Sequence, residues 1–228
     1  MKKIMTIALL AMFANATFAQ SALELAKQQA ELKAYQMKAL NAKPTKDAKK
    51  QAKQFKKEGW TVPAGEKSIE QQITESQVYG EELMADRAGN AVKRYITHTA
   101  IQAASTYNAG YAAARANSLT ELGGFLKTNL IAAIETQLNN EGKSGTDAVS
   151  VDKFSQKARY IVDEALTNSI PMLTIYRRLP NNNFEVQVRL AFDKKDLMES
   201  LKTKMQQELK IEGDKLTDIV EQAVNRVK

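Results

Sequence analysis

The stretch YNAGYAAARANSLTELGGFLKTNLIAAIETQL, residues 107–138, sets the architecture that we expect for this 228-residue chain. Apolar or small side chains recur in it every three or four residues, the spacing that lines one face of an α-helix. They are Tyr107, Tyr111, Ala114, Ser118, Leu122, Phe125, Leu126, Leu130, Ala133 and Ile134. Alanine and glycine fill much of the rest, so another element can approach the backbone closely. We therefore predict one long helix packed on a sheet.

Alternating residue patterns predict three strands around this helix. Val92–Ala100 precedes the helix, and Met172–Leu179 and Phe184–Phe192 follow it. The polar segment Pro180–Asn183 between the last two predicts a hairpin turn and hence antiparallel pairing. Apolar and polar residues alternate along the last strand. We therefore expect one of its faces to pack in the core and the other to meet solvent.

Apolar stripes with capping residues predict further helices before, between and after these strands in the sequence. Their expected ranges are 21–40, 46–58, 66–85, 153–170, 193–210 and 215–227. The pattern predicts an α+β fold: a long alanine-rich helix and a second amphipathic helix on a small antiparallel sheet, with helical extensions at both ends. We divide the chain into a signal peptide (1–19), a lysine-rich helical extension and linker (20–90), an α+β domain (91–212) and a C-terminal helix (213–228).

The amino terminus has the three parts of a secretory signal. Lys2 and Lys3 precede the apolar run Ile4–Phe13, and small residues end at Ala19. The alternative is a buried amphipathic first helix. Cysteine is absent, so the chain has neither a disulfide framework nor a lipidated cysteine. We expect an exported protein that lies in the periplasm or is associated with the outer membrane, not lipidated and without a transmembrane segment after cleavage.

Positive charge is concentrated in one short segment. The chain has a net charge of +7, and residues 20–67 hold eleven lysines against five acids. The lysines of residues 43–57 are Lys43, Lys46, Lys49, Lys50, Lys53, Lys56 and Lys57. Such a run is most often a solvated helix face. The functional alternative is attachment to an anionic envelope polymer, lipid head group or membrane surface. Nucleic acid is the weakest alternative, and we expect none, because the segment lacks arginine and has little aromatic interleaving.

The sequence offers little for catalysis or metal binding. His98 is the only histidine, and its position among strand threonines favours a sheet residue over a general base. With one histidine and no cysteine, a zinc site is nearly excluded, and calcium and phosphate loops are missing. The carboxylate pairs Glu81–Glu82 and Asp163–Glu164 are adjacent in sequence and so point to different helix faces. We expect no catalytic residues, no metal and no cofactor.

Two further features allow a functional and a structural interpretation. Arg177 and Arg178, with Arg189 on the neighbouring strand, could form a cationic sheet patch that binds a carboxylate or phosphate. Ordinary exposed strand charges are the alternative. Trp60, the single tryptophan, is either a ligand platform or, as we favour, an anchor that holds the amino-terminal helices on the domain.

Residues 92–196 resemble the LPP20-like lipoprotein family and the similar amino-terminal domain of the flagellar assembly protein T. The features that carry the resemblance are Ala109, Ala113, Arg115, Leu119 and Leu122 in the long helix, the amphipathic segment Phe154–Leu166, and the alternating strand Phe184–Leu190. The resemblance implies a small α+β domain of the bacterial envelope, used for assembly or adhesion, with no catalytic residues to carry over. Unlike the lipoproteins, this chain lacks the lipidated cysteine.

These observations lead to two hypotheses about function. The first is a non-enzymatic exported envelope protein that acts as a structural or assembly module through protein–protein contacts or self-association. Its terminal helices would contact partners, because their thin apolar stripes bury little area alone. The second is a periplasmic binding module for an anionic envelope polymer or lipid head group through the lysine-rich helix.

Overall fold

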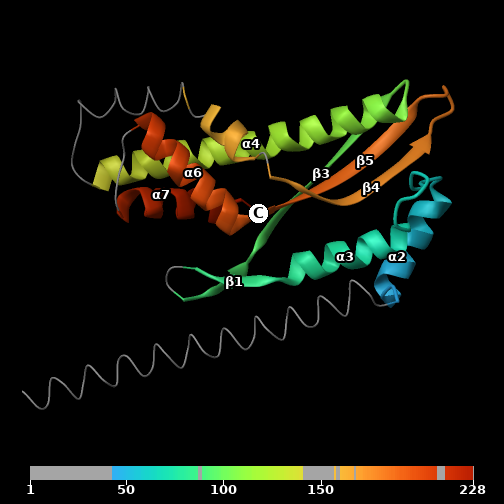
Figure 1. The fold of residues 1–228 in the computed structure, drawn as a ribbon, viewed down its shortest axis with the longest axis horizontal. Helices are drawn as coiled ribbons and strands as arrows, with labels where there is room; N and C mark the ends of the chain where they lie inside the picture. The colour runs from blue at the N-terminus through green and yellow to red at the C-terminus, as the bar shows by residue number, and fades with distance from the viewer. Residues whose placement is uncertain are drawn as a thin grey trace, which may run out of the picture.

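The computed structural model describes residues 43–86, 89–140, 157, 160–166, 168–209 and 214–227. It has an α+β fold in which the long helix α4 (Tyr107–Asn140) packs on a small antiparallel sheet (Figure 1). This sheet has the order β3–β5–β4, with β5 (Phe184–Asp193) between β3 (Tyr95–Ala104) and β4 (Ile170–Arg178). The predicted signal peptide and the predicted helix 21–40 lie outside the described residues.

The predicted hairpin between β4 and β5 is confirmed. Leu179 N donates to Asn183 O over 2.8 Å, which closes the turn. Asn182 has a φ of 66°, in the left-handed region that asparagine tolerates better than most residues. Polar turn residues that tolerate this conformation therefore set the register, in which Arg178 lies opposite Phe184.

One face of the sheet and α4 enclose the main core. Leu122, Leu126 and Leu130 of α4 have no exposed surface, whereas Phe125 is 58% exposed. The predicted apolar stripe is therefore wrong at Phe125, because the helix turns Leu122 and Leu126, four residues apart, onto the buried face. Ile161 and Val162 of the predicted second amphipathic helix are buried in the same core. Its predicted start at residues 153–156 is outside the described part of the chain. Its predicted end at residue 170 is wrong, because Ile170 already begins β4.

The carboxy-terminal helices complete this core. α6 (Lys194–Leu209) contributes Leu201 and Met205, and α7 (Asp214–Asn225) contributes its whole apolar stripe, which packs on α4. We expected the stripes of the terminal helices to remain available for partners. That expectation is wrong for α7, because its apolar side chains are already buried within the chain.

Gly110 marks the closest approach of α4 to the sheet. A Cβ atom at this position would lie 2.7 Å from Val186 Cγ2 of β5, which is closer than non-bonded carbon atoms pack. The buried small residues Ala114 and Ser118 follow on the same side of the helix. The prediction that a side-chain-poor helix face meets a sheet is thus confirmed at Gly110.

We expect Gly110→Val to lower the free energy of unfolding by about 2 kcal/mol, because the added methyl groups overpack the contact with Val186. Gly124→Val is the matched control, since Gly124 is in the same helix and nothing lies within 4 Å of its Cβ position. Chemical denaturation of both variants measures the difference. Equal effects of the two substitutions would contradict the tight contact.

The opposite face of the sheet is covered over β4 and β5, which corrects the prediction of a solvent-exposed side on the last strand. α3 (Ile69–Glu81) lies over β4, and α2 (Lys46–Lys57) packs on α3 (Figure 1). Gln187 and Ala191 on this side of β5 are buried. The alternating pattern wrongly predicted solvent exposure of the polar side of this strand. A helix can also cover polar or small residues when neighbouring residues supply the apolar contacts.

A second, smaller core lies between these two helices and β4. Its buried residues are Ala48, Ala52, Trp60, Ile69, Ile73, Leu173 and Ile175. Trp60 is 5% exposed, and its ring meets that of Phe55 edge-on with 6.4 Å between centroids. Trp60 is therefore an anchor between α2 and the sheet, as predicted, and the apolar stripe of α2 is buried within the chain.

The predicted helix 66–85 is wrong at both ends, since α3 begins only at Ile69, after its cap Ser68. α3 stops at Glu81, and Leu83–Ala85 forms the strand β1, which pairs antiparallel with β2 (Ala91–Lys93). The turn between them is predicted correctly: Asp86 N donates to Asn90 O over 2.9 Å, and Gly89 has a φ of +83°. Three-residue strands are too short to show alternation, so only the turn signal could have revealed the hairpin.

Arg94 joins this hairpin to the end of the main sheet. Its Nη1 donates to Glu82 Oε1 over 2.7 Å, and its Nε donates to Asp193 Oδ2 over 2.7 Å. Both carboxylates have only 8% of their side-chain surface exposed. Burial opposes the charge on Arg94, but the two hydrogen-bonded carboxylates outweigh it and raise the arginine pKa. This arginine links the end of α3 to the start of α6.

Tyr95 should make the fold sensitive to alkali. Burial, and then the charge of Glu82, raises the pKa of Tyr95 to about 12. The unfolded chain releases the phenol proton near pH 10, before the folded chain does, so stability is lost as the pH rises from about 10 to 12. We expect Tyr95→Phe to flatten this decline in denaturation midpoints. A decline that Tyr95→Phe leaves unchanged would contradict this assignment.

Candidate functional site

The lysine residues of α2 form a single surface, which we call the lysine face. Successive residues of an α-helix are about 100° apart, so these side chains fall within about 120° of the helix circumference and extend over about 16 Å. They are Lys46, Lys49, Lys50, Lys53, Lys56 and Lys57, all exposed. Lys43, also exposed, lies just before the helix.

The lysine face points to solvent because the opposite side of α2 is docked. Ala48 and Ala52 are completely buried, and Phe55 packs against the same small core. Thr45 caps the helix, since its side-chain oxygen accepts a hydrogen bond from Ala48 N over 3.0 Å. The Thr45 hydroxyl also donates to Gln77 Oε1 of α3 over 3.1 Å. α2 is thus held in one orientation at its start and along its buried side.

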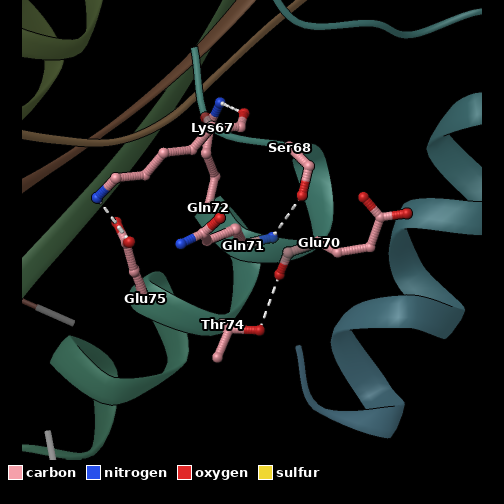
Figure 2. Close-up of polar contacts among 7 residues, drawn as sticks. All are labelled: Lys67, Ser68, Glu70, Gln71, Gln72, Thr74 and Glu75. Atoms are coloured by element: carbon pink, nitrogen blue, oxygen red, sulfur yellow. Dashed lines mark hydrogen bonds and ion pairs between the residues drawn. The ribbon is translucent and has the colours of Figure 1, made fainter. Parts of the chain in front are cut away.

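The first turn of α3 supports this docking. Ser68 caps α3 by accepting from Gln71 N, and Thr74 donates from its hydroxyl to Glu70 O over 2.8 Å (Figure 2). Figure 2 shows the Glu70 carboxylate on the side of α3 that faces α2. There it lies 2.6 Å from Lys56 Nζ. The hydrogen bond from Lys56 lowers the pKa of Glu70, so the carboxylate is charged at neutral pH.

Most of the lysine face has no compensating acid. Within the described residues, Lys56 is the only one of the seven lysines with an ion pair, and that pair lies at the edge of the face nearest α3. Asp47 is on a different side of the helix. Like charges at three- and four-residue spacing repel one another, so a counter-charged surface would relieve this repulsion.

The three arginines of the predicted cationic patch are not brought together. Arg177 and Arg178 are neighbours on β4 and so point to opposite faces of the sheet. Arg177 donates to Glu185 Oε2 and stacks over Trp60, with 4.7 Å from its Cζ to the ring centroid. Each contact ties the arginine to its own chain rather than leaving it open to a ligand.

The other two arginines are similarly engaged. Arg178 lies over the Phe184 ring on the α4 side, with its Cζ 4.8 Å from the ring centroid. Arg189 donates to Thr99 Oγ1 and to Ser76 Oγ, each over 3.1 Å, and so links β5 to β3 and α3. These contacts hold strands and helices together on both faces of the sheet.

His98 takes part in a polar group that sequence reasoning missed. Its Nδ1 lies 3.2 Å from Ser118 Oγ, and its Nε2 lies 3.3 Å from Glu121 Oε2. Serine, histidine and glutamate in this order could suggest nucleophilic catalysis. However, Ser118 has no exposed surface, so its oxygen cannot reach a substrate. The group instead links β3 to α4. The three-residue spacing of Ser118 and Glu121 indicates that they share one face of the helix. The sequence does not show that this face lies over the strand that contains His98.

A groove of about 880 Å³ runs along the outer side of α4 towards Leu166. Exposed small residues such as Ala112 and Ala116 form much of its wall, with Arg115 and Lys127 from the same helix. Among the described residues that line it, Asp163 is the only acidic one. A single carboxylate does not make the pair that general acid and base catalysis of glycoside hydrolysis requires. The lysine face is therefore the strongest candidate site.

The described residues contain no cluster of histidine and acidic side chains that could hold a metal ion. Within the same residues, every helix is too short or too polar to cross a membrane. No family model matches the chain, and searches of curated proteins and of solved structures found no match.

Proposed function

We propose that this chain is a non-enzymatic protein of the cell envelope that attaches to an anionic polymer or lipid head-group surface through the lysine face of α2. One observation carries the proposal: α2 buries its apolar side against α3 and the sheet, so that six lysines point together into solvent. The export signal predicted from residues 1–19 supports an envelope location.

The chemistry of the lysine face fits a surface rather than a shaped ligand. An ammonium group is a compact point charge on a flexible stem, and it pairs with phosphate or carboxylate without the fixed fork geometry of arginine. Six such groups along about 16 Å match a ligand that presents repeated negative charges, such as a polyphosphate-like polymer or an anionic bilayer.

Salt dependence tests this proposal. The full chain should sediment with vesicles containing phosphatidylglycerol, but not with phosphatidylcholine vesicles, at about 0.1 M salt. Binding should disappear near 1 M, where the screening length falls from about 10 Å to about 3 Å. Polyphosphate as a competitor separates a polymer ligand from a bilayer. Binding that survives high salt, or that is equal on both vesicle types, would refute attachment through the lysine face.

A second candidate function is a structural or assembly module that acts through protein–protein contacts. The observation that favours it is the outer edge of β3, a long strand that pairs only with β5 among the described residues. Unpaired strand edges recruit strands from other chains. The resemblance of residues 92–196 to LPP20-like envelope proteins implies a role of the same kind.

A further inference from the structure

The two edges of the main sheet differ in how they are protected. On β4, Thr61 N donates to Tyr176 O over 2.8 Å, and Tyr176 N donates to Thr61 O over 2.9 Å. Thr174 N donates to Gln72 Oε1 over 2.7 Å. Pro171 interrupts the same edge, because proline has no N–H to offer another strand. The chain therefore closes the β4 edge with its own atoms.

The β3 edge has none of these protections within the described residues. Ten residues, Tyr95–Ala104, pair on one side with β5, and no described strand pairs on the other side. The strand contains no lysine, arginine, aspartate, glutamate or proline. Natural sheets use such residues, bulges or very short strands to block edge-to-edge pairing. A long edge without them can pair its free N–H and C=O groups with another strand.

The side chains on β3 also suit a new strand pair. Thr97, Thr99, Ile101 and Ala103 are exposed on the face turned away from α4, and Ile101 is 47% exposed. Threonine and isoleucine are β-branched, and they pack well against cross-strand neighbours. Covering this row would bury apolar surface that is now in contact with water.

We propose that β3 pairs antiparallel with β3 of a second copy of this chain, which joins two three-stranded sheets into one of six strands. A two-fold axis at Ala100 would place Thr99 opposite Ile101 of the second copy, and Thr97 opposite Ala103. No like charges meet along this pairing, because the strand has none. On the α4 side, His98 would lie opposite Gln102, two groups that can share a hydrogen bond. The residues in each of these pairs are thus compatible.

This inference rests on the second candidate function, assembly, and it does not depend on the lysine face. We infer that the partner strand is β3 of a second copy, because two copies of this uncharged strand match each other in length and in polarity. A partner with a charged strand would find no counter-charge along Tyr95–Ala104. Association through the strand should also be insensitive to salt, unlike attachment through lysines.

The test is sedimentation velocity of the full chain over a range of concentrations, with Ile101→Lys and Ile101→Glu. Across the two-fold axis, residues 101 of the two copies are diagonal neighbours about 7–8 Å apart. Each variant alone should raise the dimer dissociation constant by about tenfold or more, because like charges face each other. An equimolar mixture of the two variants should recover the dimer, because opposite charges then meet. Thr203→Lys, at an exposed position of α6, should leave the dimer unchanged.

A second measurement uses the absence of cysteine from the chain. Ile101→Cys should be joined to itself by a short bis-maleimide in high yield, and Thr203→Cys should not. A monomer at every concentration would overturn the proposal, and so would a dimer that both charge variants leave intact. Crosslinking of the monomer to a different envelope protein would support the assembly function while it rejects self-pairing, so the two failures are distinguishable.

Discussion

Replacing Lys46, Lys50, Lys53 and Lys57 with glutamine is expected to weaken binding to phosphatidylglycerol vesicles by about 10³-fold. Each basic side chain near an anionic surface contributes roughly 1 kcal/mol, so four contribute roughly 4 kcal/mol. A tenfold change in affinity corresponds to about 1.4 kcal/mol. Vesicle sedimentation at about 0.1 M salt measures the loss. The variant should fold normally, because these side chains are exposed and α2 is held by its opposite side.

The matched control removes the same number of positive charges elsewhere. Lys93, Lys127, Lys195 and Lys202 lie outside α2, and none is fully buried. Glutamine at these four positions gives the same net charge as the first variant. If both variants bind equally weakly, the overall charge of the chain drives attachment and the lysine face has no special role. If only the α2 variant loses binding, the location of the charges matters.

Replacing Arg94 with methionine is expected to lower the free energy of unfolding by about 3–5 kcal/mol at neutral pH. Methionine fills much of the volume but leaves Glu82 and Asp193 without their arginine. Removing one partner of a buried ion pair costs this much, because the remaining charge stays desolvated. The loss should also loosen the β1–β2 hairpin, since Arg94 connects it to the end of β5. Chemical denaturation measures the first effect, and amide hydrogen exchange in residues 83–93 measures the second.

Neutralising the carboxylates provides the control for this result. In the background of Arg94→Met, the additional changes Glu82→Gln and Asp193→Asn should recover part of the lost stability, because a neutral amide is less costly to bury than a carboxylate that has lost its arginine. Arg94→Lys should be less harmful than Arg94→Met, since it keeps the charge but cannot donate to both acids in the same geometry. A loss below 1 kcal/mol for Arg94→Met would show that the carboxylates regain solvent.

Several local patterns in the chain predicted their structure well. Thr45 and Ser68 cap helices where their sequence position indicates, and Asn182 adopts the left-handed turn between two alternating strands. These features depend on atoms only a few residues apart, so neighbouring residues contain the necessary information. The burial of Trp60 was predictable for a related reason: a single large aromatic side chain beside a helix rarely stays in water.

Other features depended on contacts between distant segments. Ser76 of α3 and Arg189 of β5 are 113 residues apart, yet they share a hydrogen bond. Neither residue shows in sequence that the polar side of this strand is covered. The same holds for Arg94, whose partners Glu82 and Asp193 lie 12 and 99 residues away. Which charges pair inside a fold follows from the packing of whole elements, and local periodicity does not encode it.

The candidate sites show the same division. The helical spacing of six lysines and the separate spacing of Ala48, Ala52 and Phe55 are properties of the sequence, so an amphipathic basic helix follows from it directly. Only the tertiary structure decides that the apolar side is buried inside the chain, which leaves the lysines rather than the apolar stripe for a partner. Likewise, an uncharged strand at Tyr95–Ala104 is visible in sequence, but its place at the open edge of the sheet is not. Strand order is set by pairing across long chain separations, where the free energy comes from the combined burial of several elements.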